Sequence, residues 1–215
     1  MGDDARGISP GQEDSALPRA AAHDRLGRSA KRDEARRKVE AVALALFAQR
    51  GFDEVKVEQI CAEAAIAPAT FYRYFGSKEG VVFDYEESFL AAAGDLGTSV
   101  DPAQPVTEQL RVLVRSCALF FQEQSEMLAM RDDIVRANAG LLQRTFAIQR
   151  AFEDRLASGL AFRRHEAVPS PATLLDAAVC LVVLRVGMRA WRRREDLTLP
   201  ALTEETYASL RDRLG

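Results

Sequence analysis

Side chains able to contact a nucleic acid are concentrated between residues 56 and 78. Arg73 carries a planar guanidinium that can donate two hydrogen bonds to O6 and N7 of a guanine, a contact that discriminates between bases by about 1–3 kcal/mol. Thr70 and Tyr72 offer hydroxyl groups and Lys78 offers an ammonium group, all of which can bind phosphate oxygens. This combination predicts a surface that reads bases with one group and fixes its register on the phosphate backbone with the others.

Two short helices joined by a tight turn are predicted to position these groups. In the first helix, residues 57–64, apolar side chains recur at i, i+3, i+4 and i+7: Val57, Ile60, Cys61 and Ala64. The second helix begins near Pro68, a residue favoured in a first helical turn. Phe71 and Phe75 are four residues apart and are expected to face inward. A second helix with a buried apolar side and a polar outer side is typical of a helix-turn-helix, which presents that helix to the DNA major groove.

The segment around this motif resembles the TetR family of bacterial transcriptional regulators. The resemblance covers about residues 37–79, and the matches in order and spacing are Leu46-Phe47, Gly51-Phe52, Ile60, Thr70 to Phe75 and Ser77-Lys78-Glu79. It implies an all-α fold of about nine helices, in which a three-helix DNA-binding domain is followed by a helical ligand-binding and dimerisation domain. It also implies which residues would face DNA: Pro68, Ala69, Thr70, Tyr72, Arg73 and Tyr74, with Lys78 on a phosphate.

Three residues depart from the family pattern within the motif. Lys56 stands where Ser or Thr usually caps the first of the two helices, and Ala65 replaces the common turn glycine. Ala67 replaces the serine that often caps the reading helix, and alanine is a poorer N-cap by about 1 kcal/mol. Lys56 could replace the lost phosphate contact with a positive charge, so we count it among the DNA-binding candidates. A helical protein-interaction module that has lost DNA binding is the alternative these weak caps leave open.

The N-terminal 30 residues are predicted to be a disordered tail because they are rich in Gly, Ala, Asp, Ser and Pro and show no periodicity. Its end is basic, with Arg25, Arg28, Lys31 and Arg32. This arm either touches DNA or is a solvated tail. Residues 31–82 are expected to form the DNA-binding domain, beginning with a helix over 33–50 that stops at Gly51.

Residues 83–215 are expected to form the effector-binding and dimerisation domain. A fourth helix, capped by Ser77, is predicted to run without a break over residues 78–94 and to lead into a loop over 94–105. Further helices are expected over 106–124, 125–136, 138–164, 171–194 and 200–214. The resemblance implies that a small, largely apolar ligand binds among these helices. Candidate ligand-binding residues are Phe83, Phe89, Phe120, Phe121, Met127, Met130, Phe146, Phe152, Arg185 and Trp191.

The helix over 171–194 is apolar on nearly all sides, so we expect it to be covered by protein. In the family this helix and the last one pair with their copies, which implies a homodimer bound to an imperfect palindrome in double-stranded DNA. Arg185 is a charge inside the apolar run, and it either meets a ligand anion or pairs with an acid across a dimer interface or on a neighbouring helix. The spacing from Trp191 to the last helix is similar to that in mycofactocin-associated regulators, which suggests an acyl-type effector.

Composition excludes several other classes. The net charge of −3 gives no overall attraction to nucleic acid, but residues 25–40 carry seven basic against three acidic side chains, a local patch sufficient for phosphate contacts.

No charge-free apolar run is long enough to span a membrane and no signal peptide is visible, so we predict a cytoplasmic location. Three separated cysteines and two histidines argue against a metal site, and we expect no cofactor. No phosphate loop, dinucleotide fingerprint or nucleophile–histidine pair indicates an enzyme.

Overall fold

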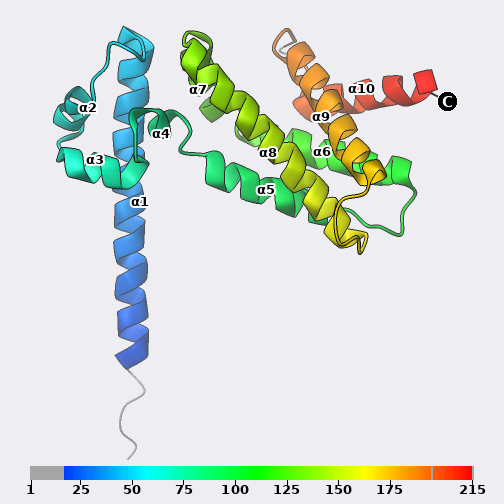
Figure 1. Ribbon diagram of the computed structural model, residues 1–215, viewed down its shortest axis with the longest axis horizontal. Coiled ribbons are helices and arrows are strands. Elements are labelled where there is room, and N and C mark those ends of the chain that lie inside the picture. The colour runs from blue at the N-terminus through cyan, green and yellow to red at the C-terminus, as the bar shows by residue number, and fades with distance from the viewer. Residues whose placement is uncertain (1–16, 195, 215) are drawn as a thin grey trace, which may run out of the picture.

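The computed structural model describes residues 17–194 and 196–214, and these residues form ten helices and no strand. The first four are α1 (Leu17–Arg50), α2 (Val57–Ala64), α3 (Pro68–Phe75) and α4 (Lys78–Val82). The other six are α5 (Glu86–Thr98), α6 (Val106–Glu123), α7 (Ser125–Arg136), α8 (Ala139–Arg163), α9 (Pro171–Trp191) and α10 (Leu199–Leu214). Helices α2 and α3 lie on one side of α1, and α4 crosses to its other side, where α5–α10 form a separate helical layer (Figure 1). The predicted all-α architecture is confirmed.

Helix α1 braces the helix-turn-helix through a small core. Its apolar stripe is buried and includes Val39, Ala43, Leu46 and Phe47. The Phe47 and Phe52 rings lie 5.0 Å apart, so the residue after the helix end folds back onto it as its sequence position suggests. Gly51, at φ 87°, ends α1 in the left-handed conformation that glycine accepts most easily.

The start of α1 differs from the prediction. The helix begins at Leu17 instead of about Asp33, so the part of the expected tail between residues 17 and 30 is helical, whereas residues 1–16 lie outside the described residues. The first half of α1 extends beyond the other helices (Figure 1). Ala, Leu and Arg dominate this stretch, and their high helix propensity outweighs the absence of an apolar stripe.

The prediction of one continuous helix over residues 78–94 was wrong, because the chain breaks at residues 83–85. The N–H of Phe83 donates to the Glu79 carbonyl (3.2 Å), and the next helix starts with the N–H of Glu86 donating to the Phe83 carbonyl (3.0 Å). The carbonyl of Val82 instead accepts a hydrogen bond from the side chain of Arg131 on α7 (3.0 Å). This hydrogen bond joins residues 49 positions apart and stabilises the break. The break divides one expected helix into α4 and α5, so the structure has ten helices where about nine were expected.

The loop predicted from residue 94 starts later, because α5 continues to Thr98 and packs tightly against α8. Two glycines allow the contact. A Cβ atom on Gly97 would lie 2.4 Å from the Leu156 carbonyl oxygen, and one on Gly159 would lie 2.4 Å from the Gly94 carbonyl oxygen and 2.9 Å from the Gly97 Cα. At these positions glycine allows the backbones of α5 and α8 to approach closely, and it does not form a turn.

Helix α9 is long and apolar enough to cross a membrane by composition alone. It packs against α6, α8 and α10, and its inner face is buried at Ala177, Cys180, Val183 and Leu184. The core helix of a globular protein can have the same composition, and one face of α9 is buried against the neighbouring helices. Its N-cap is the predicted Ser170, whose hydroxyl accepts from the N–H of Thr173.

Candidate nucleic-acid interface

Helix α3 separates its residues into an inner and an outer face. Phe71 is fully buried and Phe75 nearly so, as expected for the side packed on α1 and α2. Of the six helix residues predicted to face DNA, four are exposed and two are partly buried: Pro68, Ala69, Tyr72 and Arg73, and then Thr70 and Tyr74. The outer face of α3 is therefore accessible to a nucleic acid.

Arg73 is held along this face by its neighbours. One guanidinium nitrogen lies 3.4 Å from the hydroxyl of Thr70, and the guanidinium lies 5.6 Å from the centre of the Tyr74 ring. The Tyr74 ring in turn contacts Phe75 edge-on, with centroids 6.1 Å apart. These weak contacts limit the rotamers of Arg73 and leave its remaining donors free to pair with a base edge.

The turn between α2 and α3 contains a strained residue. Ala65 has φ 55° and ψ 48°, the left-handed conformation, and its N–H donates to the Ala62 carbonyl (3.3 Å). A residue with a Cβ atom is destabilised in this conformation by about 1–2 kcal/mol. The family's usual glycine would adopt it without this cost.

Ala65→Gly should therefore raise the free energy of unfolding by up to about 1 kcal/mol, since the relieved strain exceeds the entropy that glycine adds to the unfolded chain. Urea denaturation followed by circular dichroism would measure the change. Ala62→Gly is the matched control, because Ala62 lies one turn earlier, inside α2, where glycine should lower stability. A loss of stability in both variants would contradict the strain assigned to Ala65.

Lys56 is exposed at the start of α2, where it cannot act as a side-chain acceptor for the helix. Its own N–H instead donates to the side-chain oxygen of Gln59 (2.8 Å), which supplies half of a capping box. Next to it lies a shallow hollow of about 390 Å³ between the start of α2 and the α3–α4 turn. Its lining includes Lys56, Tyr72, Ser77 and Lys78, whose donors can bind a phosphate group, together with the carboxylates of Asp53 and Glu58.

Lys78 lies in this hollow, but its ammonium group is already bound within the protein. It donates to the carbonyl oxygens of Phe52 (2.8 Å) and Val55 (3.1 Å) and lies 4.3 Å from the centre of the Phe52 ring. Lys78 thus links the start of α4 to the α1–α2 loop, a role that was not expected from the sequence. One ammonium proton remains for a phosphate.

Lys78→Met should lower the free energy of unfolding by about 1 kcal/mol without DNA, because two charge-assisted hydrogen bonds are lost at a partly exposed site. Chemical denaturation of the DNA-free protein would show this. Lys56→Met removes an exposed lysine at the same hollow and should leave stability unchanged. Equal stability of the Lys78→Met variant and the wild type would contradict the linking role.

Four of the predicted ligand-binding residues meet in the interior of the other half. Phe89 lies at the centre, with ring centroids 5.4 Å from Phe120, 5.3 Å from Phe121 and 4.7 Å from Phe152. We call these four residues the aromatic cluster. The rings come from α5, α6 and α8, so a ligand among them would contact three helices at once.

The other predicted ligand-binding residues are dispersed. Phe83 is buried at the α4–α5 break, and Met127 and Trp191 are partly buried. Met130 and Phe146 lie on the surface, 52% and 64% exposed, away from the interior expected for them. Arg185, the charge within the apolar run of α9, is also exposed. Helical periodicity places these side chains on a face but does not reveal which face is covered.

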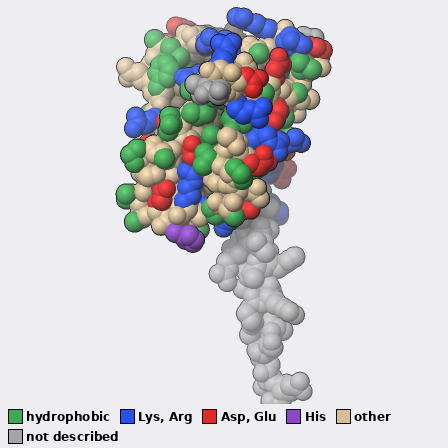
Figure 2. Space-filling model, turned by 90° about the vertical axis from the view of Figure 1, so that its right-hand side faces the viewer, with side chains coloured by type: hydrophobic (Ala, Val, Ile, Leu, Met, Phe, Trp, Pro, Cys, Tyr) green, Lys and Arg blue, Asp and Glu red, His purple; other side chains and the backbone are tan. Residues whose placement is uncertain are grey.

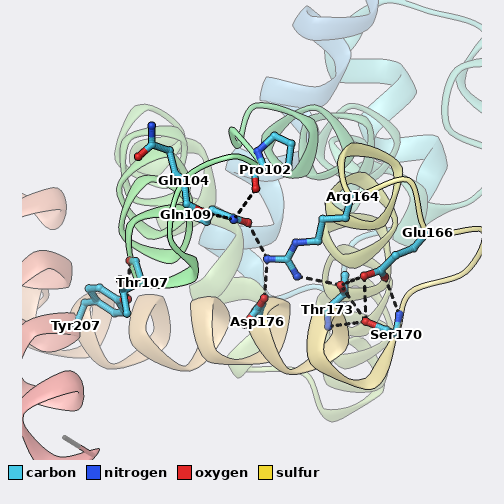
Figure 3. Close-up of polar contacts among 10 residues, drawn as sticks. All are labelled: Pro102, Gln104, Thr107, Gln109, Arg164, Glu166, Ser170, Thr173, Asp176 and Tyr207. Atoms are coloured by element: carbon cyan, nitrogen blue, oxygen red, sulfur yellow. Dashed lines mark hydrogen bonds and ion pairs between the residues drawn. The ribbon is translucent and has the colours of Figure 1, made fainter.

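Sequence reasoning missed a polar network at the far end of the helical half (Figure 3). At its centre, Arg164 pairs with Asp176 (2.7 Å) and donates to the side-chain oxygens of Gln109 (2.9 Å) and Thr173 (2.9 Å). The Glu166 carboxylate accepts from the Ser170 N–H (2.8 Å), and this hydrogen bond lowers its pKa. The network links α6, α8 and α9. Since Arg164 is engaged on several sides by protein groups, we interpret the network as an anchor and not as a ligand site.

Comparisons with known proteins agree with this geometry. Residues 41–85, which contain α2, α3 and α4, match the family described as bacterial regulatory proteins, tetR family. The chain is 32% identical over 183 residues, 80% of each chain, to the HTH-type transcriptional regulator TcmR of Streptomyces glaucescens. It is 33% identical over 90 residues, 42% of this chain and 43% of the relative, to the putative mycofactocin biosynthesis transcriptional regulator MftR of Mycobacterium tuberculosis.

A solved structure shares the arrangement of both halves. The transcriptional regulator FadR from Bacillus subtilis, crystallised with stearoyl-CoA, has a TM-score of 0.54 and 16% identity, with 80% of this chain and 95% of that chain covered. At this identity the likeness concerns the fold. The alignment with TcmR covers four-fifths of the chain, and the match to the family covers the helix-turn-helix. The chain therefore belongs to the TetR family of bacterial transcriptional regulators, which are DNA-binding proteins and not enzymes.

Proposed function

We propose that this protein is a cytoplasmic repressor that binds an imperfectly palindromic operator as a homodimer and is released by a small, largely apolar ligand. The observation that carries the proposal is the outer face of α3, where Thr70, Tyr72 and Arg73 lie on a helix held from behind by buried Phe71. A rigid helix with these groups fits the major groove. The candidate contacts at Pro68, Ala69, Tyr74, Lys56 and Lys78 belong to the same surface.

The homodimer is proposed from the outer face of α9. Leu174, Leu175, Val182 and Val186 are each at least 45% exposed on this helix. Between α9 and α10 lies a hollow of about 440 Å³, with Val182 and Val186 in its lining. A second copy would cover this apolar surface, which is too extensive for a helix facing water. Two copies related by a two-fold axis would present two reading helices to two half-sites.

Charged groups beside this surface would set the register of the two copies. Arg194, Glu205 and Arg213 line the α9–α10 hollow, and Arg185 is exposed next to Val186. Figure 2 views the α5–α10 half end-on and shows hydrophobic side chains interspersed with basic and acidic ones. We propose that Arg185 pairs with an acidic residue of the second copy.

The ligand is proposed to enter the aromatic cluster, the one place where several predicted ligand-binding residues come together. Rings packed at these distances leave room for an apolar group only if α5 or α6 moves. Ligand binding would thus favour a second arrangement of α5, and a ligand that binds this arrangement more tightly would lower DNA affinity. FadR in its stearoyl-CoA complex has the same fold, which makes an acyl-type ligand the first to test.

A gel-shift titration with the DNA upstream of the protein's own gene tests the proposal. We expect sequence-specific binding that weakens steeply with salt, two protein copies per operator, and release by stearoyl-CoA but not by coenzyme A alone. If stearoyl-CoA did not change DNA binding, the proposal of an acyl-type ligand would be rejected, whereas the proposal of a DNA-binding regulator would stand. No specific binding at low salt would overturn the proposal and favour the helical interaction module.

A further inference from the structure

Arg131 is a buried cation at the junction of the two halves. It lies on α7, its side chain is 6% exposed, and it forms an ion pair with Glu40 of α1. Its Nε atom donates to the Val82 carbonyl at the end of α4 (3.0 Å), and one terminal nitrogen donates to the Met127 carbonyl (3.1 Å). A single guanidinium therefore joins α1, α4 and α7, which only a planar group with several fixed donors can do.

The same guanidinium lies against the start of α5. Its central carbon is 5.5 Å from the centre of the Tyr85 ring, and burial raises the pKa of the Tyr85 hydroxyl. Val82 and Tyr85 flank the break between α4 and α5. Because the Val82 carbonyl has Arg131 as its partner at this break, the geometry of the turn depends on that side chain.

A second ion pair lies beside the first. Asp84, within the break, binds Arg36 of α1, and the Arg36 guanidinium lies 5.6 Å from the centre of the Phe75 ring at the end of the reading helix. Burial raises the pKa of both Glu40 and Asp84, and the negative charge of Asp84 raises that of Glu40 further. Two carboxylates and two guanidiniums thus form a compact neutral group between the halves.

The junction is in contact with both the aromatic cluster and α9. The Tyr85 and Phe89 rings lie 5.5 Å apart, so a displacement of Phe89 would reach the ring that covers Arg131. The residue after Arg131, Asp132, forms an ion pair with Arg192 just beyond α9 (2.9 Å). Helix α7 is therefore bound to the DNA-reading half through one residue and to the proposed dimer helix through the next.

We propose that Arg131 is a positioning residue that holds the DNA-reading half on the helical half, so that a displacement in the aromatic cluster reaches α1 and α4 through its guanidinium. The proposal rests on the proposed function, in which two reading helices bind one operator. Its physical basis is geometric. The two DNA-reading halves of a dimer bind two half-sites at once only if the distance between them is fixed. A loosened junction lets each DNA-reading half move independently.

Removing the guanidinium should therefore weaken binding to the whole operator and spare binding to a single half-site. The test variant combines Arg131→Met with Glu40→Gln, because removing both charges avoids leaving a buried carboxylate without its partner. Affinities for a two-half-site duplex and for a one-half-site duplex, mapped by footprinting with the wild type, are measured by fluorescence anisotropy. We expect at least a tenfold loss on the first duplex and less than a twofold change on the second.

Arg150→Met is the control. Arg150 lies on α8, is exposed, and pairs with exposed Asp154 (3.4 Å), so its removal should change neither affinity. Arg131→Lys is a second test variant that keeps the charge but cannot reach three elements, and it should behave like the double variant. The positioning role would be overturned if the double variant bound both duplexes as tightly as the wild type, or if it lost affinity by the same factor on both.

Hydrogen exchange separates this proposal from the proposed function. Without DNA, the amides of Phe83 and Glu86 at the break should exchange at least tenfold faster in the double variant than in the wild type. Unchanged exchange would overturn the role of Arg131 even if the wild type binds its operator. If the wild type bound neither duplex specifically, the proposed function would fail, and the exchange rates alone would decide whether Arg131 holds the junction.

Discussion

Arg73→Ala should weaken binding to the operator by about 100-fold or more, because each of two reading helices loses a base contact of about 1–3 kcal/mol. Arg73 is exposed on α3, and the weak contacts to Thr70 and Tyr74 orient it and leave its remaining donors free. If it reads a guanine, the loss should be greatest on the wild-type sequence and small on a duplex in which that base pair is replaced. Fluorescence anisotropy with both duplexes measures the difference.

Lys56→Met provides the comparison for Arg73. Lys56 is exposed at the start of α2 and is proposed to contact a phosphate, so its removal should weaken binding to every sequence equally and reduce the salt dependence. If Arg73→Ala also weakened both duplexes equally, Arg73 would be a phosphate contact and not a base reader. The two variants thus distinguish positioning from sequence recognition on one surface.

Gly159→Ala should lower the free energy of unfolding by about 2 kcal/mol, since the cost of overpacking is only partly offset by the higher helix propensity of alanine. The new methyl group would lie 2.4 Å from the Gly94 carbonyl oxygen and 2.9 Å from the Gly97 Cα. These are backbone atoms of α5, so relief requires the two helices to move apart. Thermal and chemical denaturation would both report the loss.

Gly94→Ala is the control for this clash. It lies in the same helix contact, but an added Cβ atom would meet nothing within 4 Å, so the variant should gain about 1 kcal/mol from helix propensity alone. Opposite signs for the two glycines would show that the close approach of α5 and α8 is specific. A stabilised Gly159→Ala variant would show that the helices separate without cost.

The sequence alone determined the reading helix and its face. Pro68 marks where α3 starts, because proline is favoured in a first helical turn. Phe71 and Phe75 mark its buried side, because residues four positions apart lie on the same face of a helix. Ala65 also stood out in the sequence, and its left-handed conformation is what a missing turn glycine implies. Local chemistry dictates these features, so short-range patterns were sufficient to find them.

Tertiary structure alone decided how the two halves are joined. The break between α4 and α5 depends on Arg131, 49 residues from the carbonyl it binds, and no local signal in residues 78–94 announces it. The role of Lys78 depends likewise on carbonyls of a loop that folds back to it, and Gly94 and Gly97 resembled loop residues until α8 was placed against them. Helical periodicity specifies which residues share a face, but the partner of that face, and hence which charges and aromatic rings are buried, is set by contacts between distant segments.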